Sequence, residues 1–319
     1  MTFTRRIVQF LPFVNYTLVG VILLLPLILG SYWQFFVAQM VIASYVAISF
    51  NLVYSYGKLL SFSQAVFFAI GAYSALYLAT ESQWSLLSIF AVAISASVLI
   101  GAIFASVFVR MGGHNPTIAT VILSSVALLS ANALGKYTGS EDGLAISAAY
   151  VGIAGLGIQT GPGLGLYYAA AVPLVILVIS LQLLQKTSFW KVIRAVAANE
   201  TRAQQLGFDV RTRRLAVIAF SAGVAGLGGV FYALLMKHVS TATFDVVLSV
   251  NAILYAVVGG LGTIAGPILG VFIIYPLTEI IAHFFLYVQI LIGAVLILVA
   301  IFFPRGILGT LHDLGDKEN

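Results

Sequence analysis

Residues 90–109 read FAVAISASVLIGAIFASVFV, a run of 20 residues without a charged side chain. A transmembrane α-helix needs about 20 mainly apolar residues to cross the hydrocarbon core of a bilayer. A strand of a membrane β-barrel would instead alternate apolar and polar residues over roughly 10 positions. Because this run is continuous and long, it predicts a spanning helix, which pairs every backbone amide internally in lipid.

The whole chain shares this character. Of its 319 residues, 61% are hydrophobic and only 8% are charged, and the mean hydropathy is +1.09. A soluble protein of this length needs many more charged residues to cover its surface. We therefore expect an all-α, polytopic membrane protein, with residues 1–319 forming a single transmembrane domain.

Similar apolar stretches predict about ten spanning helices, within a range of eight to ten. The expected segments are residues 13–30, 33–54, 62–80, 85–109, 115–134, 164–184, 214–236, 246–258, 264–282 and 284–303. Segment 246–258 is too short to cross alone, and segment 62–80 begins with polar residues. The first segment follows Arg5 and Arg6, so it has two interpretations, a signal peptide and a retained helix. We favour the helix because apolar sequence continues past Leu29 without a small-residue cleavage site.

The basic residues predict the orientation, because they concentrate on the cytoplasmic side of a membrane. With the N-terminus inside, ten helices place 13 of the 15 Lys and Arg residues in the cytoplasm and leave only Lys136 and Lys237 outside. Both termini are therefore expected in the cytoplasm. The outer segment, residues 135–163, is rich in Gly, Ser and Ala and carries Glu141 and Asp142. A short surface helix, a landing place for an external partner and a mobile loop all stay open for it.

One cytoplasmic segment, residues 186–214, holds seven basic and two acidic residues. Its net charge of +5 equals that of the whole chain. Such a segment has three interpretations. It satisfies the bias of basic residues toward the cytoplasm, it contacts anionic lipid at roughly 1 kcal/mol per basic residue, or it docks a cytoplasmic protein.

The pattern within this segment predicts two short amphipathic helices, residues 188–198 and 200–206. An apolar stripe recurs at helical spacing on the first helix; its members are Phe189, Val192, Ile193, Val196 and Ala197. Asn199 is a favourable N-cap for the second helix, and Gly207 suits the position just after a helix end.

At these residues the sequence resembles a known family. Residues 189–210, FWKVIRAVAANETRAQQLGFDV, are similar to the cytoplasmic loop of branched-chain amino acid ABC transporter permeases of the LivM-like type. Further similar blocks are residues 51–52, 65–73, 138–139 with 142–144, 219–233, 257–270 and 303–309. The resemblance thus extends from about residue 45 to residue 309, and its specificity comes from several ordered blocks in combination.

The resemblance implies an inverted-repeat importer permease in a bacterial inner membrane, with a cytoplasmic loop that sits in a cleft of an ATPase subunit. The residues that it assigns to ATPase coupling are Arg194, Ala195, Asn199, Glu200, Ala203, Leu206 and Gly207. It also implies a second homologous permease subunit, two cytoplasmic ATPase subunits and an extracytoplasmic substrate-binding protein, in a membrane lipid environment and without nucleic acid. The solute would be a branched-chain or other amino acid, or a related amide or organic acid.

The chain departs from the family around residues 55–64. The family usually has glycine where this chain has Ser55, Lys58 and Ser63, and histidine where Gln64 stands. These residues lie near the expected transport pathway, so the departures leave the cargo open.

Enzymatic chemistry is not expected in this chain. Neither Gly57-Lys58 nor Gly135-Lys136 is followed by Ser or Thr, so there is no Walker A motif, and ATP and Mg²⁺ are assigned to the partner ATPases. The chain has no cysteine, and its four histidines share no metal-ligand spacing. We predict no catalytic residue, no metal site and no cofactor.

Polar residues within apolar segments are the candidates for a solute pathway. They are Asn51, Ser61, Gln64, Thr117, Thr120, Ser124 and Asn251. Most Ser and Thr residues in such helices bond their own backbone, whereas an amide is costly to leave unpaired, which favours Asn51 and Asn251. A stand-alone secondary transporter or channel is the alternative function, but it would need an ion-coupling carboxylate, and Glu279 is the nearest candidate.

Two glycine-rich stretches predict close helix packing. Gly262, Gly266 and Gly270 are spaced by four, which lets helices approach closely in lipid. Pro267 predicts a break or kink in the same stretch. Residues 56–73 and 257–272 faintly echo each other, as the halves of an inverted repeat would.

Overall fold

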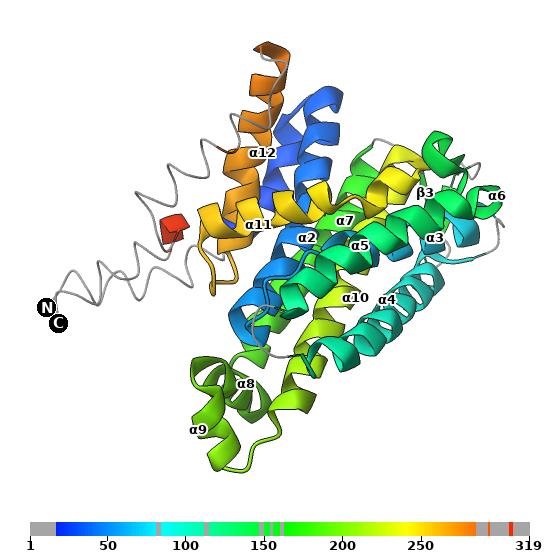
Figure 1. Cartoon of the computed structure of the whole chain (residues 1–319). Helices are drawn as coiled ribbons and strands as arrows, with labels where there is room; N and C mark the ends of the chain where they lie inside the picture. The colour runs from blue at the N-terminus through cyan, green and yellow to red at the C-terminus, as the bar shows by residue number, and fades with distance from the viewer. Residues whose placement is uncertain are drawn as a thin grey trace, which may run out of the picture.

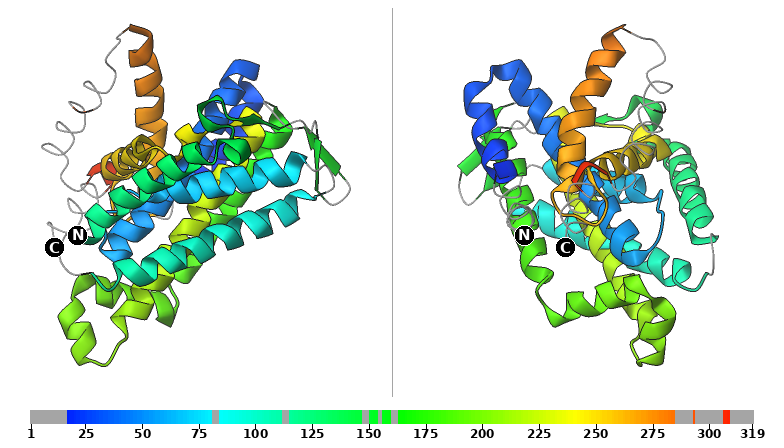
Figure 2. Two further views of the ribbon diagram at one scale, coloured as in Figure 1. Left: turned by 45° about the vertical axis from the view of Figure 1, so that its right-hand side comes forward. Right: turned by 90° about the vertical axis from the view of Figure 1, so that its left-hand side faces the viewer.

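The computed structural model describes residues 17–80, 84–111, 115–146, 150–153, 156–159, 163–284, 293 and 306–308. A helix over Thr17–Ile28 comes first and is followed by the helices labelled in Figure 1. The larger ones are α2 (Ser31–Gly57), α3 (Gln64–Thr80), α4 (Leu86–Phe108), α5 (Asn115–Ala133), α7 (Leu164–Leu184), α10 (Val210–Met236), α11 (Val246–Gly259) and α12 (Gly266–Phe284). Two shorter helices, α8 (Ser188–Ala198) and α9 (Glu200–Gln205), project from one end of the bundle, as both views in Figure 2 show.

The predicted multi-pass helical architecture is confirmed. Within the described ranges, five helices are long and apolar enough to cross a membrane: α2, α4, α5, α7 and α10. Four shorter apolar helices match the segments predicted at 13–30, 62–80, 246–258 and 264–282. Segment 214–236 in fact begins at Val210, because Asp209 caps the helix there. Segment 284–303 lies outside the described residues, apart from Phe284 and Gly293.

The central element is α10, which packs against α2, α3 and α4 and is buried along most of its length. Its glycines make this packing possible. A Cβ on Gly71 of α3 would overlap the backbone carbonyl of Gly226 in α10, and one on Gly229 would overlap the backbone of Phe68. These helices therefore touch backbone to backbone, as small residues permit in lipid.

A second pair of helices, α11 and α12, meets in the same way. A Cβ on Gly259 would overlap Gly266, and one on Gly270 would overlap the carbonyl of Tyr255. The prediction that Pro267 kinks a helix is wrong. Pro267 is the second residue of α12 and opens it, because a backbone N–H in the first turn of a helix has no intrahelical partner to lose.

Two helix–connection–helix units correspond to the echo expected from the sequence. In the first, α2 ends at Gly57 and α3 begins at Gln64; in the second, α11 ends at Gly259 and α12 begins at Gly266. Residues 58–63 and 260–265 are thus two non-helical connections, here named the first and the second connection.

The end of the bundle that carries α8 and α9 is here named the basic end. At the opposite end, residues 135–163 include a short helix, one of the alternatives left open by the sequence, and strands that the sequence did not predict. The elements are the helix α6 (Gly135–Thr138), a 3₁₀ turn η1 (Ser140–Asp142) and the strands β1 (Leu144–Ala145), β2 (Tyr150–Ile153) and β3 (Leu156–Gln159). Strand β2 pairs with β3, and β1 pairs with β4 (His238–Val239), which directly follows α10. A second 3₁₀ turn, η2 (Thr241–Phe244), leads into α11.

We predict that Gly71→Ala destabilises the protein by about 1–3 kcal/mol, the usual cost of forcing an extra group into a packed site. The matched control is Gly20→Ala, because a Cβ at Gly20 meets nothing within 4 Å. That control should leave stability unchanged or raise it by up to about 1 kcal/mol through helix propensity. Thermal unfolding of the detergent-solubilised variants measures both, and equal midpoints would show that the contact between α3 and α10 has room to spare.

Candidate functional site

The two short helices at the basic end have the boundaries that the sequence predicts, to within one residue. Thr187 caps α8 by accepting a hydrogen bond from the Trp190 N–H, and Asn199 caps α9 by accepting one from the Arg202 N–H at 2.9 Å. Gly207 follows the end of α9 with a φ of +83°, a left-handed conformation that glycine adopts at low cost. The caps predicted at Asn199 and Gly207 are therefore confirmed.

The inner face of α8 differs from the predicted apolar stripe in one residue. Trp190, Ile193 and Val196, spaced by three, are buried, and the Trp190 ring packs edge-on against Tyr56 of α2 at 5.0 Å between centroids. The assignment of Phe189 to this stripe is wrong, because its side chain is 44% exposed. The guanidinium of Arg213 lies 4.7 Å from the centre of the Phe189 ring.

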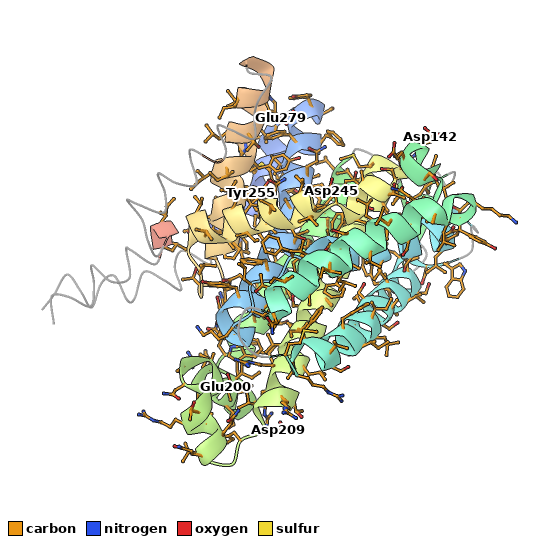
Figure 3. All side chains as sticks on the ribbon, viewed as in Figure 1. Asp142, Glu200, Asp209, Asp245, Tyr255 and Glu279 are labelled. Atoms are coloured by element: carbon orange, nitrogen blue, oxygen red, sulfur yellow. The ribbon has the colours of Figure 1, made fainter. Side chains whose placement is uncertain are left out.

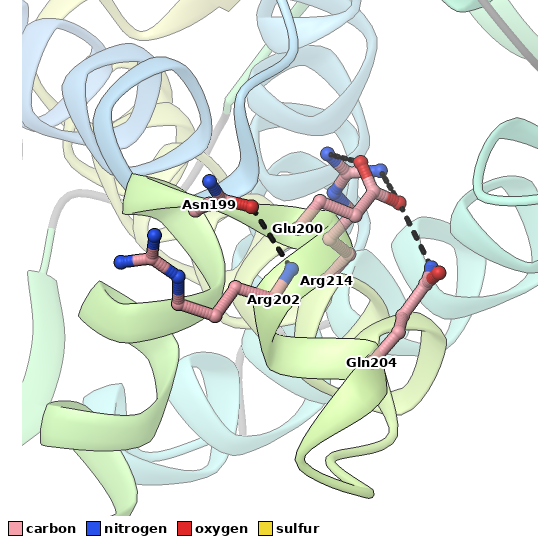
Figure 4. A network of polar contacts seen from close by, with 5 residues as sticks. All are labelled: Asn199, Glu200, Arg202, Gln204 and Arg214. Carbon is pink, nitrogen blue, oxygen red and sulfur yellow. Dashed lines mark hydrogen bonds and ion pairs between the residues drawn. The ribbon is translucent and has the colours of Figure 1, made fainter.

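An ion pair joins α9 to α10 (Figure 4). Arg214 Nη1 donates to Glu200 Oε1 at 3.1 Å, and Arg214 Nη2 lies 2.9 Å from Glu200 Oε2, so the contact is bidentate. These two helices and α8 share a small apolar cluster that consists of Val196, Ala203 and Val210. A partly exposed pair of this kind contributes about 1 kcal/mol or less to stability, but its fork geometry fixes the orientation of α9 relative to α10.

The entry into α10 is capped by Asp209. Its carboxylate accepts hydrogen bonds from the hydroxyl and the backbone N–H of Thr212. These hydrogen bonds lower the pKa of Asp209, which favours the charged form at a helix N-terminus.

The seven predicted coupling residues divide into two groups. Ala203 is buried and Glu200 is held by Arg214, so these two fix the helix pair. The other five are exposed: Arg194, Ala195, Asn199, Leu206 and Gly207. Beyond the end of α9, the apolar side chains of Leu206 and Phe208 are 70% and 38% exposed. The loop thus presents an uncovered apolar tip on a rigid support.

Three hydroxyl groups hold the first connection. The Phe62 N–H donates to Thr120 Oγ1 at 3.0 Å, and the Phe62 carbonyl accepts from Ser124 Oγ at 2.7 Å and from Ser249 Oγ at 2.8 Å. Thr120 and Ser124 come from α5, and Ser249 comes from α11. Backbone groups between helices at membrane depth need such partners, so these polar residues bind the chain itself.

One amide holds the second connection. Asn51 of α2 accepts from the Gly262 N–H at 2.9 Å and donates to the Thr263 carbonyl at 2.8 Å. Ser55 Oγ also donates to Asn51 Oδ1 at 2.9 Å. Asn51 is buried and its amide is fully engaged.

The remaining pathway candidates from the sequence lie apart. The hydroxyls of Ser61 and Ser63 lie 2.9 Å apart in the first connection. Gln64 is buried and accepts from Ser49 Oγ at 2.6 Å, while its Nε2 has no partner among the described residues. Thr117 lines a separate cleft at the basic end.

Asn251 lines a cavity of about 180 Å³ between α2, α3, α10, α11 and α12. With it lie Gln39 and three tyrosines, and the Tyr275 hydroxyl donates to Gln39 Oε1 at 2.6 Å. The other lining residues are apolar, and none is charged: Ile42, Ala43, Val46, Phe68, Met236, Leu248 and Ala252. The volume corresponds to about six water molecules at 30 Å³ each. A concave, mainly apolar space with a few polar groups is the usual form of a small-molecule site.

The sequence singled out Asn251 but missed Gln39, Tyr232, Tyr255 and Tyr275. Tyrosine is common in this chain, with 15 residues, so no local signal marks these three.

The acidic residues of the described ranges lie at helix ends or on the surface, as the labels in Figure 3 show for Asp142, Asp245 and Glu279. Asp245 caps α11 by accepting from the Val247 N–H at 2.9 Å. Among the described residues, no cluster of three or more His, Cys, Asp or Glu side chains has the arrangement of a metal site.

Comparison with known proteins gives a family match over most of the chain. The family model described as "Branched-chain amino acid transport system / permease component" matches residues 33–300. A probable branched-chain amino acid transport permease protein LivH of Methanocaldococcus jannaschii is 28% identical over 155 residues, 46% of this chain and 49% of the relative. The high-affinity branched-chain amino acid transport system permease protein LivM of Escherichia coli is 25% identical over 143 residues, 45% of this chain and 34% of the relative.

A third relative is a probable ABC transporter permease protein YphD of Escherichia coli, 29% identical over 119 residues, which are 36% of each chain. The chain therefore spans half or less of the length of these curated relatives. No solved structure matches it.

We predict that Asn51→Leu destabilises the protein, because it removes the hydrogen bonds that the Asn51 amide makes with the Gly262 N–H and the Thr263 carbonyl. Gly262 is exposed and Thr263 is half-buried, so each lost hydrogen bond costs about 1 kcal/mol. Ser55→Ala is the matched control, since it removes one donor to the same Asn51 oxygen and leaves both backbone bonds intact. Thermal unfolding in detergent should show a large loss for Asn51→Leu and a small one for Ser55→Ala. Equal losses would mean that the second connection does not depend on Asn51.

Proposed function

We propose that this chain, which belongs to the family of branched-chain amino acid transport system permease components, is the membrane-spanning subunit of an ATP-driven importer for a small polar solute. One observation carries the proposal. The helix pair α8–α9 presents an uncovered apolar tip, Leu206 and Phe208, while a bidentate ion pair ties α9 to the central helix of the bundle. A surface of this kind suits docking to a separate subunit that supplies the motion.

The geometry supports a direct mechanical route from the tip into the membrane. A displacement of α9 acts on α10 through Glu200 and Arg214. Glycines of α10 then bring it into backbone contact with α3 and into close contact with side chains of α2 and α4. Packed elements of this kind move as rigid bodies between discrete arrangements. We infer that two cytoplasmic ATPase subunits bind the basic end and hydrolyse ATP with Mg²⁺, while this chain itself is not catalytic.

The remaining assembly follows from the same proposal. The basic end faces the cytoplasm, in keeping with the positive-inside bias, and both termini lie on that side of a bacterial inner membrane. A second homologous permease subunit completes the passage, and an extracytoplasmic substrate-binding protein delivers the solute to the opposite end, near α6 and the short strands.

The cavity at Asn251 is the proposed contact with the solute. Its lining offers amide and phenol groups for hydrogen bonds and apolar side chains from α2 and α11. Such a lining suits a small solute with one aliphatic part and one polar part, such as an amino acid, an amide or an organic acid. The relatives named for branched-chain amino acid transport support the first of these classes.

We predict that Leu206→Glu abolishes docking. The Leu206 side chain is 70% exposed, so the variant should insert and unfold like the unchanged chain. It should lose at least about tenfold in affinity for its cognate ATPase subunits, as the loss of a central apolar contact does at an interface. Gln205→Glu adds the same charge one residue away and is the control. Co-purification and ATP-dependent uptake in proteoliposomes measure the effect. An intact, active complex with Leu206→Glu would refute the coupling assignment.

We predict that Asn251→Leu raises the KM for uptake at least about tenfold, the loss expected when one hydrogen bond of about 1.4 kcal/mol is removed. Assembly with the ATPases should be unaffected, because the cavity lies far along α10 from its junction with α9. Ser125→Ala, on the exposed face of α5, is the control. The assay is ATP-dependent uptake of whichever of L-leucine, acetamide and benzoate is transported. An unchanged KM would remove the cavity from the solute pathway.

A further inference from the structure

A second cavity lies at the basic end, beside the junction between α9 and α10. It has a volume of about 670 Å³ and is an open cleft lined by the end of α2, the first connection, the end of α4, the start of α5, α9 and the start of α10. Three basic side chains line it, Lys58, Arg211 and Arg214, against one carboxylate, Glu200. The rest of the lining is largely apolar and includes Leu60 and Ile118. This cavity is here named the basic cleft.

Lys58 occupies the basic cleft in a strained backbone conformation. It directly follows α2 with a φ of +53°, in the left-handed region. Glycine is the usual residue at such a position after a helix, and another residue pays about 1–3 kcal/mol. The Lys58 side chain is exposed, and no ion pair joins it to a carboxylate in the described part of the chain. The Lys58 backbone N–H caps α2 by donating to the Val53 carbonyl, whereas its side-chain charge has no ion-pair partner in the described structure. A charge that the fold does not use, on a residue that is unfavourable for its backbone, points to a ligand.

Two of the basic side chains that line the cleft have no ion-pair partner in the described structure. Arg214 is neutralised by Glu200. Arg211 lies near Asp209, but that carboxylate is already engaged by Thr212, and among the described residues Arg211 forms no ion pair with it. Lys58 and Arg211 therefore remain available to an anion.

The walls of the cleft select the kind of anion. Beside it, α4 ends and α5 begins, and both helices carry exposed apolar side chains along their length, such as Ile103 and Ile122. An anion with hydrocarbon chains would place its charged group between Lys58 and Arg211 and its chains along these helices. A free phosphate ion would leave the apolar walls unused.

We propose that the basic cleft binds the phosphate headgroup of an anionic phospholipid. Because Arg214 belongs both to the cleft and to the ion pair with Glu200, a bound phosphate competes with Glu200 for this guanidinium. The lipid thereby loosens the junction between α9 and α10. Lipid binding is inferred from the cleft alone, whereas the effect of the lipid on coupling rests on the proposed function.

The test compares two double variants of the assembled, delipidated complex. Lys58→Gln with Arg211→Gln removes two charges from the cleft, and Lys186→Gln with Lys191→Gln removes two exposed charges elsewhere on the same segment. Native mass spectrometry measures binding of phosphatidylglycerol and, for comparison, phosphatidylcholine. The cleft variant should lose about thirty-fold in affinity for phosphatidylglycerol, the effect of two basic residues near a membrane surface. The control should lose less than about threefold, and equal losses would show diffuse attraction and overturn the site.

Two further measurements separate the remaining outcomes. Lys58→Gly should unfold at a higher temperature, since glycine relieves the strain, yet bind phosphatidylglycerol more weakly; unweakened binding would overturn the role of Lys58. An excess of inorganic phosphate should not displace the lipid, and efficient displacement would assign the cleft to a free anion.

The ATPase activity of the complex, compared in phosphatidylcholine vesicles with and without phosphatidylglycerol, tests the effect on coupling. The activity should respond to the anionic lipid in the unchanged complex and not in the cleft variant. A complex without coupled ATPase activity would contradict the proposed function but leave the binding result intact. Lipid binding without any change in activity would overturn the competition for Arg214.

Discussion

The structure depends on one constraint: a chain that stops being helical within a membrane must find partners for the backbone groups it frees. In the described part of the chain, the connections after Gly57 and after Gly259 illustrate it. The first connection receives three hydroxyl groups at Phe62, and the second receives the amide of Asn51. The helices α2, α3, α11 and α12 are thus held together by hydrogen bonds between distant parts of the chain, in addition to apolar packing. The polar residues within the apolar segments therefore provide the hydrogen bonds that the backbone needs where a helix is interrupted.

A second consequence concerns α10, which links the two ends of the molecule. Its first turns carry Arg214 and the junction with α9, and its last turns carry Tyr232 and Met236, which line the cavity at Asn251. Between these ends it touches its neighbours through glycines, where there is no side chain to deform. A helix in backbone contact with α3 and in close contact with side chains of α2 and α4 cannot slide without moving them, so it is well placed to carry a displacement from the basic end to the cavity.

The sequence predicts the helices well because lipid imposes a simple rule on length and hydrophobicity, and segment 164–184 matches α7 at both ends. It also predicts the caps of α9, because Asn199 and Gly207 act locally. The sequence does not predict features that depend on contacts between residues far apart in the chain. Trp190 replaces Phe189 on the inner face of α8 because Tyr56 provides a partner for its ring, and Tyr56 lies far away in the sequence. The pairing of β1 with β4 joins residues almost one hundred positions apart. The tyrosines of the cavity come together only when α10, α11 and α12 are in place.

The residues in which the chain departs from its family now have a different interpretation. Ser55 donates to Asn51, Ser63 lies within hydrogen-bonding distance of Ser61, and Gln64 accepts from Ser49. These three side chains are used inside the protein, so their presence reflects how this chain holds its connections and its core. Lys58 is the exception, because it is exposed and strained and has no ion pair in the described structure. The departures therefore say little about the cargo. Under the proposed function the solute is chosen by the side chains around Asn251, and under the proposed lipid site the charge at Lys58 binds a headgroup.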